Sequence, residues 1–237
     1  MIHDDNFSVD ELQARVDPQR SLLLLQISDS GFPIGGFAHS SGLESAMKWG
    51  AVVDATALEQ FVRDALTQVA HGSLPLVRAT HRGEEFSKLD RICDAFLNSH
   101  VANRASRRQG QAFLNTVDKV FACNEIRKFS EVILSERLPC HFAPVFGRCL
   151  ALLNGDQRET LQLFLFMTLR SLISSAIRLG IVGPMYGHAM QHESSSLVTD
   201  LVDDFTDSEA TQTCQTAPLI ELLQATHDRV YSRLFQS

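Results

Sequence analysis

The sequence predicts an all-α fold: a single globular helical domain of about eight to ten helices with a central apolar helix. Apolar residues recur at the three- and four-residue spacing of amphipathic helices almost everywhere, whereas the two-residue alternation of strands is almost absent. Residues 157–179 are apolar on nearly every side, which is typical of a helix at the centre of a bundle. A chain of 237 residues can bury a sizeable core without metals or disulfides.

The N-terminal part is expected to contain a leader, a short helix and an unusual connector. Residues 1–18 form a flexible acidic leader without the apolar centre of a secretory signal, and residues 19–237 form the helical domain. An apolar helix is expected at residues 21–27. The connector that follows, residues 28–44, reads SDSGFPIGGFAHSSGLE and holds more glycine and serine than a simple turn requires.

The next three helices are expected at residues 56–71, 87–103 and 104–121. The first two begin with TALE, Thr56–Glu59, and SKLD, Ser87–Asp90. Both motifs match a capping box, in which a hydroxyl accepts from a backbone N–H and the acid three residues later reaches back. The sequence therefore predicts that the hydroxyls of Thr56 and Ser87 cap these helices.

A break between helices is expected at residues 138–144, LPCHFAP, because prolines bound it on both sides. Asp156 is predicted to cap the apolar helix at residues 157–179. Gly180 and Gly183 are suited to the left-handed backbone that ends a helix, and Pro184 is suited to the first turn of the next one.

The last helix is expected to open at Pro218, since proline is favoured in a first helical turn. Helical spacing places six side chains on one face if this helix continues to the end of the chain. They are Leu219, Leu222, Leu223, Thr226, Val230 and Leu234.

The net charge of −7 argues against a general nucleic-acid-binding protein, which needs a basic surface to replace phosphate counterions. Between Leu179 and Asp228 there is no Lys or Arg, while acidic residues are frequent. A solvated acidic face explains this tract, and so does a surface for a basic partner protein. The sequence leaves both interpretations open.

The cysteines and the apolar runs favour a cytoplasmic protein. The five cysteines are scattered and form no C-x-x-C pair, so neither a disulfide framework nor a zinc site is indicated. The most apolar run, residues 161–173, contains Arg170 and is shorter than the roughly 20 residues of a membrane span. We therefore expect no membrane association.

No catalytic residue and no cofactor is predicted. The stretch GFPIGGFAHS lacks the lysine of a phosphate-binding loop, and no G-x-S-x-G motif is present. His39 beside Ser40 and Ser41 has the residue types of a base and a nucleophile, but a histidine of this kind more often satisfies a helix end.

Two further clusters have open interpretations. His188 and His192 lie four residues apart, so both can face one metal ion; without a recognisable third ligand they fit a surface pair equally well. Arg104, Arg107 and Arg108 lie within about one helical turn. A solvated face, a docking patch and an arginine finger for a GTPase all remain possible for them.

Four stretches together resemble the UreF family of urease accessory proteins. They are LLQISDSGFPIGGFAHSSGLE at residues 24–44, ASRRQG at 105–110, SSAIRLGIVGP at 174–184 and the C-terminal APLIELLQATHDRVYSRLFQS at 217–237. Their order and spread cover nearly the whole chain apart from the leader. The chain departs from the family pattern at His188, where Gln is expected, and at Gly31, where Ala is common.

The resemblance implies a dimeric all-α protein without catalysis of its own. Such a protein assembles with a UreD/UreH-type protein, recruits a UreG-type GTPase, engages apo-urease and promotes nickel insertion. The alternatives are a regulator of the GTPase that acts through Arg107 or Arg108, and a nickel relay through His188 and His192.

The resemblance also supplies candidate partner-binding residues. They are Phe37, His39, Glu44, Arg107, Arg108, Tyr231, Arg233, Leu234 and Phe235. The C-terminal tail of the chain either becomes ordered on the UreD-type partner or folds back on its own bundle. The resemblance favours docking on the partner.

Overall fold

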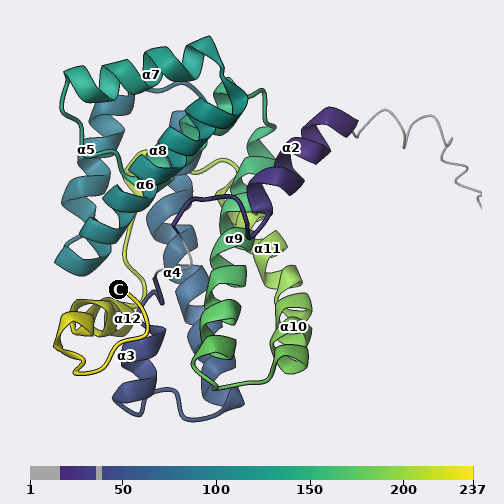
Figure 1. Ribbon diagram of the computed structural model, residues 1–237, viewed down its shortest axis with the longest axis vertical. Coiled ribbons are helices and arrows are strands. Elements are labelled where there is room, and N and C mark those ends of the chain that lie inside the picture. Colours follow the sequence, from purple (N-terminus) through teal and green to yellow (C-terminus); the bar gives the residue numbers. More distant parts are fainter. Residues whose placement is uncertain (1–16, 36–38, 237) are drawn as a thin grey trace, which may run out of the picture. The chain divides into compact units, whose positions relative to one another are not determined.

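A computed structural model describes residues 17–35 and 39–236 (Figure 1). The chain divides into two compact units, residues 1–32 and 33–237. In the first unit, α2 (Pro18–Ser28) begins with proline in its first turn, and the Asp17 carboxylate accepts a hydrogen bond from the Gln19 N–H at 3.0 Å. The helix predicted at residues 21–27 is therefore present, with its start three residues earlier.

The described part of the second unit contains ten α-helices and two short 3-10 helices, and the all-α prediction is confirmed. In chain order the elements are α3 (Leu43–Lys48), α4 (Ala55–His81), α5 (Phe86–Phe96), α6 (His100–Phe121), α7 (Asn124–Ser135), α8 (Phe142–Leu152), α9 (Gln157–Arg178), α10 (Pro184–Glu193), α11 (Ser195–Phe205), η2 (Ala210–Gln212), α12 (Pro218–Ala225) and η3 (His227–Arg229).

The core of the second unit forms where α4, α6, α8 and α9 meet. α8 packs on α4 and α6, and α9 packs on α4, α10 and α11. Four phenylalanine rings link three of these helices: Phe113 of α6, Phe142 and Phe146 of α8, and Phe164 of α9, with centroid separations of 5.2 to 5.6 Å. These are the separations at which aromatic pairs attract one another.

The apolar helix predicted at residues 157–179 is α9, and the Asp156 cap is confirmed by a 3.1 Å hydrogen bond from the Glu159 N–H. Among the described residues, α9 is the one helix whose length and composition would allow it to cross a membrane. In its most apolar window 61% of the residues are buried inside the protein. A core helix has the same property, so this finding is weak evidence for a membrane.

Both predicted capping boxes are wrong. α4 begins at Ala55, and the Asp54 carboxylate, rather than Thr56, accepts from the Ala57 N–H at 2.9 Å. α5 begins at Phe86, where no side chain caps the helix. The acid of the second motif, Asp90, is buried and accepts hydrogen bonds from another part of the chain.

α4 also runs ten residues beyond its predicted end at His71, through Pro75. A proline inside a helix leaves the carbonyl four residues earlier without its helical donor. Here the His71 carbonyl instead accepts from the Cys214 N–H at 3.2 Å. The residues that lead to α12 therefore satisfy the carbonyl that Pro75 frees.

The last predicted helix begins correctly at Pro218 but ends at Ala225, so its extension to Leu234 is wrong. η3 follows, and residues 230–236 are not helical. The six side chains predicted on one face therefore separate. Leu223 and Val230 are buried, whereas Leu219 and Leu222 are exposed.

Candidate functional site

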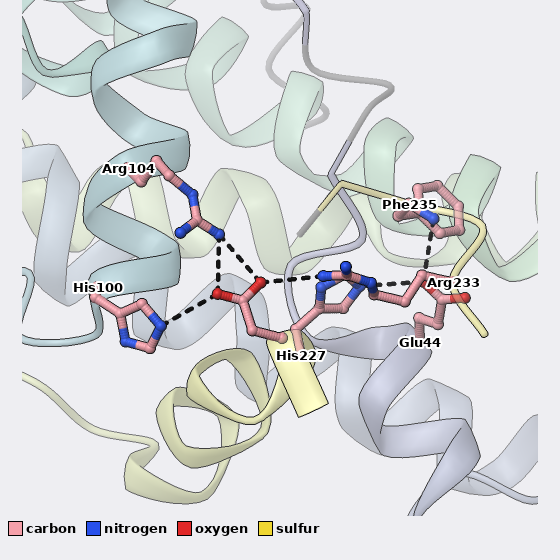
Figure 2. A network of polar contacts seen from close by, with 7 residues as sticks. Glu44, His100, Arg104, His227, Arg233 and Phe235 are labelled. Carbon is pink, nitrogen blue, oxygen red and sulfur yellow. Dashed lines mark hydrogen bonds and ion pairs between the residues drawn. The ribbon is translucent and has the colours of Figure 1, made fainter. Parts of the chain in front are cut away.

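The C-terminal segment, residues 226–236, lies close to α3 and α6 (Figure 2). Figure 2 shows His100 and Arg104 of α6 on one side of a polar network, and Glu44 of α3 with Phe235 on the other. Two candidate partner-binding residues far apart in the sequence, Glu44 and Phe235, therefore lie in one region.

Glu44 is the centre of the first half of this network. Its side chain is buried, yet its carboxylate accepts from the Leu234 N–H at 2.6 Å and from the Phe235 N–H at 3.1 Å. His227 Nε2 lies 3.1 Å from the same carboxylate. Because a buried charge requires several hydrogen bonds, these contacts make Glu44 the anchor of the C-terminal segment.

Gly42 explains part of the glycine content of the connector. It precedes α3 with φ of +89°, a left-handed conformation that glycine adopts without strain. A Cβ at this position would lie 3.0 Å from the Gln224 side chain and 3.3 Å from its backbone nitrogen. The glycine therefore lets α12 pass close to the start of α3, which carries Glu44.

The tail folds back on its own bundle, the alternative that the sequence left open. Phe235 is 5% exposed, and the Arg178 guanidinium lies 4.3 Å from the centre of its ring, within cation–π range. Tyr231 is fully exposed and Leu234 is 53% exposed. Docking of the tail on a partner stays a prediction, with Tyr231 and Leu234 as its accessible side chains.

Asp228 is the centre of the second half of the network. Both of its carboxylate oxygens accept from Arg104 at 3.1 Å, Arg233 Nη1 lies 3.1 Å away, and His100 Nε2 lies 3.2 Å away. Burial tends to raise the pKa of Asp228, but Arg104 and His100 outweigh it and lower this pKa below its ordinary value. One carboxylate thus joins α6 to the C-terminal segment.

His39 lies beside this network. Burial lowers the pKa of His39, and the charges of Arg108 and Arg104 lower it further, which favours the neutral imidazole. His39 lines a cavity of about 220 Å³ together with Ser41 and Ser106.

Ser40, which follows His39, is buried, and its Oγ accepts from the Glu44 N–H at 3.4 Å. This contact agrees with a helix-end role for the serine. Arg107 and Arg108 are both exposed. Phe37 lies outside the described residues.

The sequence did not predict a partly buried polar cluster that joins α5, α6 and the start of α8. The Asp90 carboxylate accepts from the Cys140 N–H at 2.7 Å and from the His141 N–H at 2.8 Å. The His141 ring lies 3.1 Å from Ser106 Oγ and 3.0 Å from Asp94 Oδ1. Burial raises the pKa of Asp90 and lowers that of His141.

This cluster has the residue types of a hydrolytic triad, but its hydrogen bonds serve the start of a helix. Ser106 Oγ accepts from the Phe142 N–H at 3.2 Å, so the serine satisfies the first turn of α8. The cluster therefore fastens three helices together. Its members come from three separate segments, which is why no local motif indicated it.

His188 and His192 are exposed on α10. Among the described residues, no group of three or more His, Cys, Asp or Glu side chains is placed to hold a metal ion. The pair therefore has no third protein ligand in the part of the chain that the structure describes.

The fold and the site define an all-helical protein whose C-terminal segment is anchored on its own bundle. Comparison with known proteins shows that the chain belongs to the UreF family, whose model matches residues 52–195. The chain is 36% identical to urease accessory protein F of Arabidopsis thaliana, over 90% of each chain. It is 33% identical to the protein of that name from Oryza sativa subsp. indica, over 89% of this chain and 82% of the relative.

A bacterial relative extends the comparison. Urease accessory protein UreF of Cupriavidus pinatubonensis is 29% identical over 93% of this chain and 99% of its own. The resemblance to UreF proteins that the four sequence stretches indicated is confirmed.

Proposed function

We propose that this chain is a non-catalytic assembly factor of urease maturation. It acts in the cytoplasm with a UreD/UreH-type protein and a UreG-type GTPase, and promotes GTP-dependent nickel insertion into apo-urease. Membership of the UreF family is the observation that supports this proposal most strongly. The absence of a phosphate-binding motif from the sequence agrees with a GTPase on a separate chain.

The geometry of the C-terminal segment supports a docking role. Glu44 accepts hydrogen bonds from the backbone of this segment, and the side chain of Phe235 is buried, while Tyr231 and Leu234 are exposed. Aromatic side chains on an anchored backbone are typical hot spots of interfaces, because little conformational entropy is lost on binding. We propose that Tyr231 and Leu234 contact the UreD-type partner.

The chain is proposed to form a homodimer. This proposal rests on membership of the UreF family. Exposed apolar side chains such as Trp49 (61% exposed), Val53 (73%) and Met185 (86%) are available to such an interface.

A first prediction tests the docking role. The double substitution Tyr231→Ala and Leu234→Ala should abolish the stable complex of the full chain with its own organism's UreD-type protein, because it removes exposed apolar contacts. Light scattering after size exclusion measures the mass of the complex. Phe235 and the backbone donors to Glu44 are kept, so the tail itself should stay folded.

The matched control is Leu134→Ala on α7, where the leucine is 67% exposed and remote in sequence from the tail. This variant should assemble like the wild type. Normal assembly of the double variant would contradict the role of the tail. Failure of the well-folded wild-type chain to bind would contradict the assembly function.

A second candidate function is regulation of the GTPase through an arginine. The observation that favours it is the exposure of Arg108, which forms no ion pair within 4.0 Å among the described residues. Arg108→Ala should then lower GTP turnover by the UreG-type partner at least about a hundredfold while the complex stays intact. GTP hydrolysis in the isolated complex measures this, and unchanged turnover would rule the candidate out.

A further inference from the structure

The first half of α6 carries a basic face on an otherwise acidic chain. His100, Arg104, Arg107 and Arg108 follow the spacing of residues on one side of a helix. All four line an open surface depression, together with Leu97, Asn98 and Asn103. We call this depression and its four cationic side chains the α6 basic face.

Asp228 already occupies one end of the α6 basic face. Arg104 bonds both of its oxygens and His100 contacts it from the same helix, while Arg233 approaches from the C-terminal segment (Figure 2). Arginine is well suited to hold a carboxylate through several N–H groups at once. The α6 basic face is thus built to bind carboxylates, and Asp228 is its internal occupant.

The other end of the face has cations in excess. Arg107 and Arg108 form no ion pair within 4.0 Å among the described residues. Asp94 accepts from Asn103 and contacts His141; these two contacts, and in smaller measure the charge of Arg107, hold the pKa of Asp94 below its ordinary value, but Arg107 forms no ion pair with it within 4.0 Å. Two arginines therefore remain available to an acidic ligand.

The surroundings favour a protein ligand over a nucleic acid or a small anion. The net charge of −7 and the acidic tract at residues 179–228 disfavour a nucleic acid, whose phosphates continue past the depression, more than a short acidic segment that is confined to it. The depression is open, and Arg107 and Arg108 are exposed, so a small ion would stay largely hydrated there. An acidic protein segment can contact several of the cations at once.

We infer that the α6 basic face is a docking site for an acidic segment of a partner protein, and that Asp228 competes for it from within the chain. Carboxylates of the partner pair with Arg107 and Arg108, and a further carboxylate of the partner replaces Asp228 in the ion pair with Arg104. Because an exposed ion pair contributes little free energy, this exchange costs little. The inference rests on the proposed function only in that the partner belongs to urease maturation.

The test is fluorescence anisotropy of a labelled hexaglutamate peptide titrated with the full chain at low salt. Arg107→Glu with Arg108→Glu should weaken binding at least about tenfold. Asp228→Asn should strengthen it by about three- to tenfold, because the internal competitor is lost. If Asp228 only holds the C-terminal segment in place, Asp228→Asn should weaken peptide binding or leave it unchanged. The sign of the change in affinity therefore decides whether Asp228 competes with the peptide.

Two control variants match these substitutions in charge. Arg127→Glu with Lys128→Glu reverses two adjacent exposed cations on α7. Asp203→Asn breaks an exposed pair of the same kind, in which Arg158 lies 2.6 Å from the carboxylate. Neither control should change the affinity for hexaglutamate by more than about twofold.

Several outcomes would overturn the inference. Equal losses in the α6 and α7 variants would mean that net charge alone attracts the peptide. Tighter binding of tripolyphosphate than of hexaglutamate at Arg107 and Arg108 would assign the face to phosphate. The titration needs no partner protein, so its failure leaves the proposed assembly function standing.

Discussion

Gly147→Ala is expected to lower the free energy of unfolding by about 3 kcal/mol or more, because α4 and α8 touch at this glycine. A Cβ there would lie 2.1 Å from the Val77 carbonyl oxygen and 2.4 Å from Thr80 Oγ1. Both atoms belong to buried residues near the C-terminal end of α4, and the carbonyl cannot turn away without distorting the helix. Only a separation of the two helices relieves the clash.

Urea unfolding followed by far-ultraviolet circular dichroism measures this loss. The matched control is Gly183→Ala, where a Cβ meets nothing within 4 Å and φ is −76°. Because Gly183 is the N-cap of α10, where alanine is less favourable than glycine, the control should lose about 1 kcal/mol or less. Similar midpoints for the two variants would contradict the described contact between α4 and α8.

Gly110 has the same role where α6 meets the start of α8. A Cβ on this α6 residue would lie 2.1 Å from the Cys140 carbonyl oxygen and 2.8 Å from the carbonyl carbon of His141. The segment that it would strike is held by the Asp90 carboxylate, so it cannot retreat freely. Gly147 in α8 and Gly110 in α6 therefore let α8 approach α4 and α6 at backbone distance.

These contacts illustrate which parts of the fold the sequence could predict. Asp156 was identified as a cap because its acceptor serves a donor three residues away, so the signal is local. Thr56 failed as a cap because Asp54, two residues earlier, supplies the acceptor for this helix. Ser87 failed because Asp90 of its motif serves backbone donors 50 and 51 residues further along the chain.

The candidate site divides in the same way. The resemblance to UreF proteins identified Glu44 and the tail, but not that they bind one another across 190 residues. Nor could helical spacing show that Asp228 turns toward Arg104, because α12 ends before it and η3 redirects the chain. Long-range contacts of this kind depend on how the helices pack, which the local sequence does not specify.

Glu44→Gln is expected to release the C-terminal segment and to lower the free energy of unfolding by about 2–4 kcal/mol. The carboxylate accepts from two backbone N–H groups, one on each oxygen, and contacts His227. The amide of glutamine has only one acceptor oxygen, and its own N–H donors would face the remaining partner of the second oxygen. At least one buried donor would lose its partner. Release of the segment would also separate Phe235 from Arg178.

Hydrogen exchange at the Leu234 and Phe235 amides reports the release directly, and digestion by a carboxypeptidase reports it independently. Glu131→Gln, an exposed residue on α7, is the matched control and should keep the protection of the wild type. If Glu44→Gln keeps both amides protected, Glu44 is not the anchor of the tail. If protection is lost and the UreD-type partner still binds, the partner itself orders the segment, and the internal anchor only determines where the free tail rests.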